Sequence, residues 1–167
     1  MTSGHDIAMG LRAAYWAMHR QTEVRLTGRG VTADQFVLLA LLAERDGITQ
    51  QELVRRASSD ANTVRAMLVL LESRGLVTRG RHPTDRRAHS VTLTRKGRRT
   101  HERLWADSEP VRQRLLAAFR PKEADTLVEF LNCISEALTQ AAADHDPRYQ
   151  PSAPKVRTQR LLKGKQR

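Results

Sequence analysis

The chain has 167 residues, of which 40% are hydrophobic, enough for one domain with a buried core. Its 29 lysines and arginines outnumber 18 acidic residues, and this net charge of +11 favours a polyanionic partner. The longest apolar run, residues 36–43, is far shorter than the roughly 20 residues of a membrane span, and the N-terminus lacks a signal-peptide pattern. We therefore expect a soluble, cytoplasmic protein with no membrane partner.

The chemistry-bearing residues give little support to an enzyme. Cys133 is the only cysteine, which excludes an intramolecular disulfide and a cysteine-based zinc site. A lone cysteine is usually a small buried hydrophobe, although a disulfide between two subunits stays open if position 133 faces its own copy. The sequence contains no phosphate-binding glycine loop and no nucleophile motif. We expect no catalytic site, no metal and no cofactor.

Two helices are predicted at the start of the chain. From residue 6 to about 26, apolar residues recur at the spacing of one helical face: Ile7, Leu11, Tyr15, Met18 and, less regularly, Val24. Gly28 and Gly30 end this helix. Thr32 and Gln35 form a capping box for a second helix to about residue 45, which is apolar on most sides and is therefore expected in the centre of the domain.

A short helix and a longer one follow. Thr49 and Glu52 predict another capping box, for a helix reaching about residue 57. Asp60 caps a fourth helix, and Gly75 stands where a C-cap glycine belongs. In that fourth helix Val64, Met67 or Leu68, and Leu71 form the inward stripe, and the outward side carries Asn62, Thr63, Arg65 and Ala66.

After Gly75 the apolar period changes from helical to alternating, so residues 76–78 and 91–94 are predicted to be the strands of a β-hairpin. Ile48 could add one more residue of strand. The long tip of the hairpin carries one acid, Asp85, among six basic or imidazole side chains: Arg79, Arg81, His82, Arg86, Arg87 and His89. The hairpin is therefore the most positively charged part of the predicted domain.

The rest of the chain predicts two more helices and a tail. A fifth helix runs from Lys96 to about residue 119, and Pro110 should kink it or end a first segment near Glu109. Pro121 begins a sixth helix through about residue 143, whose apolar face is formed by Leu127, Phe130, Leu131, Ile134 and Leu138. Residues 147–167 hold seven lysines and arginines and no acid, and predict a disordered basic tail.

Two helices joined by a short turn and followed by a basic hairpin are the layout of a winged helix-turn-helix. Four runs in order also resemble the signature of the MarR family: DANTVR at 60–65, LLESRGLV at 70–77, HPTDRRA at 82–88 and VTLTRKG at 91–97. The resemblance extends over roughly residues 6–143. Its most specific part is the Asp-x-Arg of the wing with the Leu-Thr-x-x-Gly that follows.

This resemblance implies a mainly α fold with a small β-hairpin: a winged helix-turn-helix domain at 31–95 and a helical dimerisation region at 6–30 and 96–143. Physics agrees in outline, because the apolar faces of the terminal helices would otherwise be exposed to water. A two-fold dimer would place its recognition helices one turn of DNA apart, roughly 34–36 Å, and would read a pseudo-palindrome.

The resemblance also implies DNA contacts at matching positions. Arg87 corresponds to the wing arginine that enters the minor groove, and Asp85 to the acid that orients it. Arg86 and Arg81 are then expected at a phosphate or in the groove. The fourth helix offers Asn62, Thr63 and Arg65 to base edges or nearby phosphates, and Gln50 and Gln51 are placed to hold a phosphate.

Each assignment has a structural alternative. Asn62 and Thr63 are favoured residues near helix starts, Arg65 would also serve as a solvated surface charge, and Asp85 as a turn residue.

In this family, small aromatic or phenolic ligands bind between the dimer helices and the winged domain. The residues that could line such a crevice are Tyr15, Trp16 and His19. In the alternative interpretation Tyr15 and Trp16 belong to the dimer core and His19 lies on the surface.

The predicted function is thus a sequence-specific regulator of transcription that binds double-stranded DNA as a homodimer at a pseudo-palindromic operator, with repression and relief by a small molecule as the family default. The alternative is an architectural or nonspecific nucleic-acid-binding protein driven by its basic wing and tail. An enzyme built on His82, Asp85 and His89 is disfavoured, because these residues lie on a loop without a second shell of supporting groups.

Overall fold

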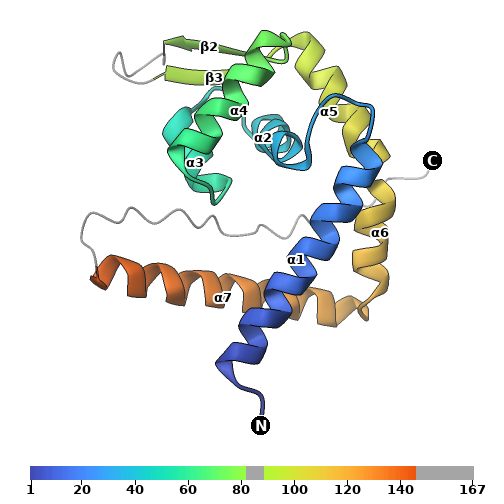
Figure 1. The fold of residues 1–167 in the computed structure, drawn as a ribbon, viewed down its shortest axis with the longest axis vertical. Helices are drawn as coiled ribbons and strands as arrows, with labels where there is room; N and C mark the ends of the chain where they lie inside the picture. The colour runs from blue at the N-terminus through green and yellow to red at the C-terminus, as the bar shows by residue number, and fades with distance from the viewer. Residues whose placement is uncertain (82–88, 146–167) are drawn as a thin grey trace, which may run out of the picture.

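A computed structural model describes residues 1–81 and 89–145, and over these residues the fold is mainly helical with one small sheet (Figure 1). This confirms the predicted fold class. The elements follow one another as α1 Gly4–Leu26, α2 Ala33–Glu44, β1 Ile48–Thr49, α3 Gln50–Arg56, α4 Ala61–Ser73, β2 Val77–Arg81, β3 His89–Leu93, α5 Arg95–Asp107, α6 Glu109–Ala117 and α7 Pro121–His145.

The helix starts are set by short-range polar contacts that are legible in the sequence. Thr32 and Gln35 form both halves of a capping box at α2, as predicted. At α3 one half of the predicted capping box is wrong. The Thr49 hydroxyl accepts a hydrogen bond from the Glu52 amide at 3.1 Å, but the Glu52 carboxylate accepts none from the Thr49 amide. It binds the Arg55 guanidinium at 2.6 and 2.9 Å, a charge-assisted pair that competes for the same oxygens.

The sheet has three antiparallel strands in the order β1-β3-β2. The hairpin strands are longer than the sequence pattern predicted, and Arg79 pairs with Val91 and Arg81 with His89 in the register. Two residues of β1 pair on the other edge of β3, where one had been expected. The hairpin is thereby anchored to the segment that immediately precedes α3.

The core lies where α2, α4, α5 and the sheet meet. As predicted, α2 is central, since Leu38, Leu39 and Leu42 are fully buried, but Val37 is 44% exposed. The predicted inward stripe of α4 is confirmed, with Leu68 as its central member and Met67 partly buried beside it. The other side chains of this core with no exposed area are Leu53, Val64, Leu71, Val91 and Leu104.

The long helix expected after the sheet is divided in two at Ser108. Its hydroxyl is buried and donates to the carbonyl of Leu104 at 2.8 Å, and α6 begins one residue later with Pro110 in its first turn. A proline lacks the amide that would continue the ladder of α5, which accounts for the break. The predicted proline start of the last helix is also observed, at Pro121.

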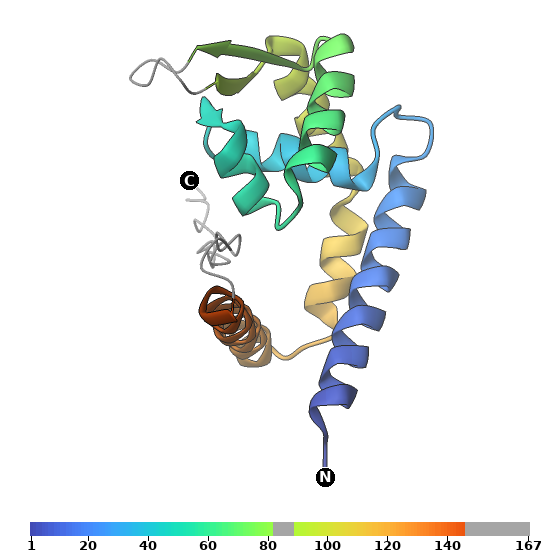
Figure 2. The same cartoon turned by 60° about the vertical axis from the view of Figure 1, so that its left-hand side comes forward.

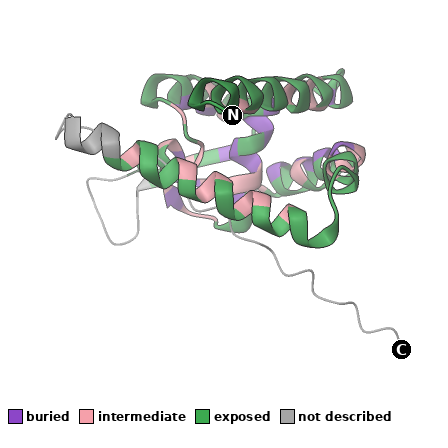
Figure 3. Ribbon diagram, turned by 90° about the horizontal axis from the view of Figure 1, so that it is seen from below, coloured by how far each residue is buried: buried purple, intermediate pink, exposed green. Residues whose placement is uncertain are grey.

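Helices α1 and α7 leave most of their apolar side chains uncovered in the single chain. In α1 only Leu26 is buried, while Ile7 and Tyr15 are about half exposed. Helix α7 crosses the end of the molecule remote from the sheet (Figures 1 and 2), and none of its described side chains is buried (Figure 3). Cys133, expected to be buried, is exposed on this helix.

Candidate nucleic-acid interface

Helices α3 and α4 form a helix-turn-helix unit with a tight connection. Ser58 adopts a left-handed backbone conformation at φ 49°, and the amide of Ser59 donates to the carbonyl of Val54 at 3.3 Å. Asp60 then caps α4 by accepting the amide of Thr63 at 2.9 Å. This turn sends α4 off in a new direction, with α3 lying beside it (Figure 1).

Helix α4 has one wholly buried face and one open face. Val64, Leu68 and Leu71 have no exposed area, so they fix the rotation of the helix about its axis. The three candidates for base contacts, Asn62, Thr63 and Arg65, are all exposed, and so is Ala66. No acid stands on this open face within the helix, since Glu72, the only one, is turned toward β2.

For Thr63, the structure supports the alternative role of starting the helix. The Thr63 amide and hydroxyl both bind the Asp60 carboxylate, and these bonds lower the pKa of Asp60. Thr63 is therefore already engaged in the cap. Arg65 makes no ion pair within the described residues and is exposed on the open face.

The other helix of the unit begins with the two predicted phosphate ligands. Gln50 is half-buried and Gln51 is exposed, both in the first turn of α3, directly after β1. Two amide side chains therefore lie at the N-terminus of α3. The ion pair with Arg55 lowers the pKa of Glu52, and the positive guanidinium balances the negative charge of this carboxylate.

An ion pair that the sequence pattern did not reveal ties α4 to the hairpin. The Arg79 guanidinium binds the Glu72 carboxylate, with Nε at 2.9 Å, and the Arg79 backbone amide donates to the same carboxylate at 3.2 Å. These bonds lower the pKa of Glu72. The sequence pattern placed Arg79 in the tip of the hairpin, but it lies within β2, where it holds this strand against α4.

A second set of side-chain contacts holds the hairpin at the end away from its tip. Asp46, in the turn after α2, accepts the amides of Gly47 at 3.1 Å and Leu93 at 2.9 Å, and its other oxygen binds the Arg98 guanidinium. It joins α2, β3 and α5 at one point. The sequence offered no signal for either anchor, because a single acid matched to an arginine seven or 52 residues away has no local signature.

The tip of the wing lies outside the described residues, and with it the predicted groove contacts Asp85, Arg86 and Arg87 and the alternative site residue His82. Arg81 ends β2 at the base of this tip, opposite His89. From the C-terminal end of α4 the two strands extend toward the side where α3 lies (Figures 1 and 2). Residues 147–167, the predicted tail, also lie outside the described part.

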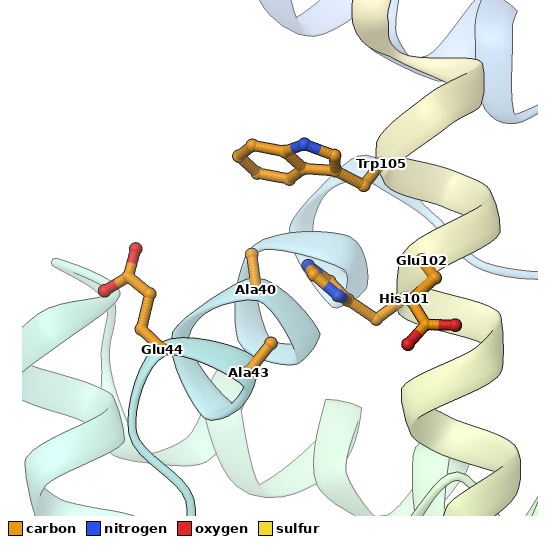
Figure 4. A pocket seen from close by; sticks show the side chains of 6 residues that line it. All are labelled: Ala40, Ala43, Glu44, His101, Glu102 and Trp105. Atoms are coloured by element: carbon orange, nitrogen blue, oxygen red, sulfur yellow. The ribbon is translucent and has the colours of Figure 1, made fainter. Parts of the chain in front are cut away.

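The three candidate effector residues meet on α1. The ring centroids of Tyr15, Trp16 and His19 are 5.5 to 5.8 Å apart, and Nε2 of His19 lies 3.5 Å from the Asp34 carboxylate on α2. Burial and the nearby Asp34 raise the pKa of Tyr15. A cavity occurs elsewhere, between α2 and α5, and none of these three side chains lines it (Figure 4).

Two features are absent from residues 1–81 and 89–145. None of the helices described there is long and apolar enough to cross a bilayer. In the same residues no three His, Cys, Asp or Glu side chains gather as metal ligands.

A family model described as the MarR family matches residues 31–89, the segment that forms the helix-turn-helix and the hairpin. The HTH-type transcriptional regulator YdgJ of Bacillus subtilis is 33% identical over 102 residues, which cover 61% of this chain and 62% of that protein. The HTH-type transcriptional repressor Mb2911 of Mycobacterium bovis is 31% identical over 97 residues, 58% of this chain and 70% of that protein. The chain spans 48% to 62% of the length of three curated relatives that it matches.

A solved structure agrees over a longer range. Bordetella bronchiseptica BpsR, described with a mechanism for regulation of its DNA binding by 6-hydroxynicotinic acid, is 29% identical with a TM-score of 0.69. The match covers 77% of this chain and 98% of that one, and so includes helices outside the winged domain.

Proposed function

This chain belongs to the MarR family, and on that premise we propose that it is a regulator of transcription that binds double-stranded DNA sequence-specifically, as a homodimer and as a repressor. The operator would be a pseudo-palindrome, because two symmetric copies present two identical recognition helices. The named relatives are regulators and not enzymes, which supports a binding function.

The observation that carries this proposal is the two-faced packing of α4. Three fully buried side chains fix the rotation of the helix about its axis, so Asn62 and Arg65 lie on its exposed face. An amide matches the edge of adenine and a guanidinium matches that of guanine in the major groove. A recognition helix whose rotation is fixed in this way needs no reorientation of its backbone when it binds DNA, which lowers the cost of binding.

Contacts around the recognition helix would supply affinity. We assign Gln50 and Gln51 to backbone phosphates, and Arg81 with the wing residues Arg86 and Arg87 to phosphates or the minor groove, with Asp85 orienting Arg87. The support is the position of α3 and of the two strands beside α4, with the family resemblance for the tip. Phosphate contacts fix the register of a protein on DNA but do not read its sequence.

We assign dimerisation to residues 6–30 and 96–143. The support is the uncovered apolar surface of α1 and α7, where Phe130 and Leu138 are 61% and 67% exposed. Monomeric proteins rarely leave such a surface in water, and a two-fold interface between copies would cover it.

We further propose that a small aromatic or phenolic effector relieves repression. BpsR, whose DNA binding is regulated by 6-hydroxynicotinic acid, offers a precedent. On this chain the clustered rings of Tyr15 and Trp16, with His19 beside Asp34, are the candidate contacts on α1. The packing of that cluster at the α2 boundary would link an occupied site to the position of the winged domain.

The test is selection of bound DNA from a random pool, followed by footprinting. We expect one pseudo-palindromic motif, bound about a thousand-fold more tightly than random DNA. Arg65→Ala should cost roughly 1–3 kcal/mol of operator binding, about five-fold to 150-fold in affinity, and relax the base preference at one position of each half-site. Arg120→Ala removes the same charge from an exposed position between α6 and α7 and should have little effect.

The competing function is architectural binding driven by the wing and the basic tail. It predicts equal affinity for any sequence and an equal loss from both arginine variants. Removal of residues 147–167 separates the two functions: a regulator keeps its footprint and loses part of its salt dependence, whereas an architectural protein loses most of its binding.

A further inference from the structure

The open face of α4 carries a continuous stripe of short, uncharged side chains. Its members recur at the spacing of a single helical face, four, three and four residues apart: Asn62, Ala66, Val69 and Ser73. All of them are exposed, and by the period of the helix they lie opposite the buried Val64, Leu68 and Leu71. The stripe is therefore the line along which α4 faces the molecule that this helix binds.

The charged side chains of α4 stand beside this stripe and not on it. Arg65 precedes Ala66 by one residue, so it is turned from Ala66 by about 100° around the helix axis. Glu72 is turned toward β2, where it pairs with Arg79. Because the stripe itself carries neither a charge nor a long side chain, the backbone of α4 can approach the floor of the major groove closely.

The middle of the stripe is apolar. Ala66 offers one methyl group and Val69 offers two, and Val69 is 47% exposed. At the far end of the stripe the Ser73 hydroxyl turns back to the helix and donates to the Leu70 carbonyl at 2.9 Å. Asn62, at the near end, carries an amide that matches the edge of adenine. The stripe thus begins with a hydrogen-bonding group and continues as a methyl-covered surface.

Duplex DNA has one apolar group that fits such a surface. In the major groove the base edges present hydrogen-bond donors and acceptors, and thymine adds its C5 methyl group, which alanine and other apolar side chains contact. Contact between two methyl surfaces removes both from water and is therefore favourable. A protein partner could also cover apolar side chains, but this stripe is continuous with Asn62 on the face that we assign to DNA.

We propose that Ala66 and Val69 read thymine through its methyl group, beside the adenine that Asn62 reads. This inference rests on the proposed function, and it names the bases that the open face of α4 selects. Ala66 and Val69 lie about 6 and 10 Å along the helix from Asn62, at a rise of about 1.5 Å per residue. Base pairs are about 3.4 Å apart, so for a helix that lies along the groove the thymines fall about two and three base pairs from the adenine.

Uracil tests this proposal directly, because it lacks only the methyl group of thymine and keeps the same hydrogen-bonding edge. The motif selected from the random pool is synthesised again with uracil in place of one thymine of each half-site, position by position, and the dissociation constant of each duplex is measured. We expect binding to weaken about four-fold at one or two thymines of each half-site, the contribution of one buried methyl group. Uracil outside the footprint should have no effect.

Two variants connect the methyl effect to the protein. Ala66→Gly and Val69→Ala each remove methyl groups from an exposed position and leave the buried face of α4 unchanged. Each should lower the ratio between the uracil and thymine dissociation constants toward one at its own base pair and keep it near four at the other. Val24→Ala, the same kind of change at an exposed position on α1, should keep both ratios. A loss of folded protein cancels in each ratio, because both duplexes are titrated with the same protein.

Three results would overturn the inference: a motif in which every thymine can be replaced by uracil without loss, a half-site without thymine, or ratios that stay the same in both variants of α4. In each case a specific motif has been selected, so the proposed function survives. A random pool that yields no motif defeats the proposed function, and the inference falls with it. The two failures are therefore told apart by whether a motif is found.

Discussion

Arg79 of β2 and Glu72 of α4 are joined three times, through the backbone amide, Nε and Nη2 of the arginine. The pair is two-thirds buried and links α4, which we propose as the recognition helix, to the hairpin. We expect Glu72→Gln to lower the free energy of unfolding by only about 1 kcal/mol, because partly exposed ion pairs are weak. Operator affinity should fall more than stability does, since the angle between wing and helix is no longer fixed. Glu129→Gln serves as the control, and an unchanged operator affinity at normal stability would contradict the role of the pair.

The same carboxylate predicts a dependence of stability on pH. The hydrogen bonds from Arg79 hold the pKa of Glu72 below its ordinary value, and those from Arg55 do the same for Glu52. The stabilisation is therefore present above the ordinary pKa and is lost as the pH falls through the lowered one, from about pH 5 downward. Urea titrations at a series of pH values should show the free energy of unfolding falling over this range. In Glu72→Gln the free energy of unfolding should fall less steeply with pH. The same dependence on pH in that variant would show that Glu72 does not contribute to the loss of stability in acid.

Asp46 should matter chiefly as an acceptor of backbone hydrogen bonds. Asp46→Ala leaves the amides of Gly47 and Leu93 without their acceptor, at an expected cost of about 1–3 kcal/mol. Asp46→Asn keeps a carbonyl oxygen for both amides and loses only the charge opposite Arg98, so it should cost less than half as much. Thermal unfolding of the two variants decides the matter. Equal losses would mean that the ion pair dominates.

Gly97 is required because the backbone of another segment occupies the space of a side chain. A Cβ at this position would lie 2.0 Å from the carbonyl oxygen of Leu76, which no small adjustment relieves. We expect Gly97→Ala to destabilise the fold by more than about 2 kcal/mol. Gly80→Ala, where a Cβ meets nothing within 4 Å, is the matched control and should be tolerated. Similar melting temperatures for both variants would refute this explanation.

The apolar face of α7 predicts a dimer that charge can disrupt. Phe130→Glu with Leu138→Glu places two carboxylates on the surface that we assign to the partner copy, and light scattering should then report a monomer. Asp125→Lys changes the charge on the exposed polar side of the same helix and should leave the dimer intact. A wild-type chain that is already monomeric at micromolar concentration would refute the assignment.

The order and type of the elements followed from sequence patterns because their causes are local. Thr32 and Gln35 meet within one turn, Asp60 caps the helix it precedes, and a proline ends the ladder where it stands. The motif Leu-Thr-x-x-Gly also has a local half, since Thr94 caps α5 by accepting the Gly97 amide at 2.9 Å. Its other half, the contact of Gly97 with Leu76, is visible only in three dimensions.

Contacts between distant segments could not be read in this way. Nothing near Glu72 in the chain indicates that Arg79 turns back to it, or that Asp46 reaches Leu93 and Arg98. The cavity beside His101 exists because two helices that are 50 residues apart leave a space where alanines face an aromatic wall. Periodicity shows which face of a helix is apolar, but only the packed chain shows which apolar faces find a partner within it and which, as on α1 and α7, do not.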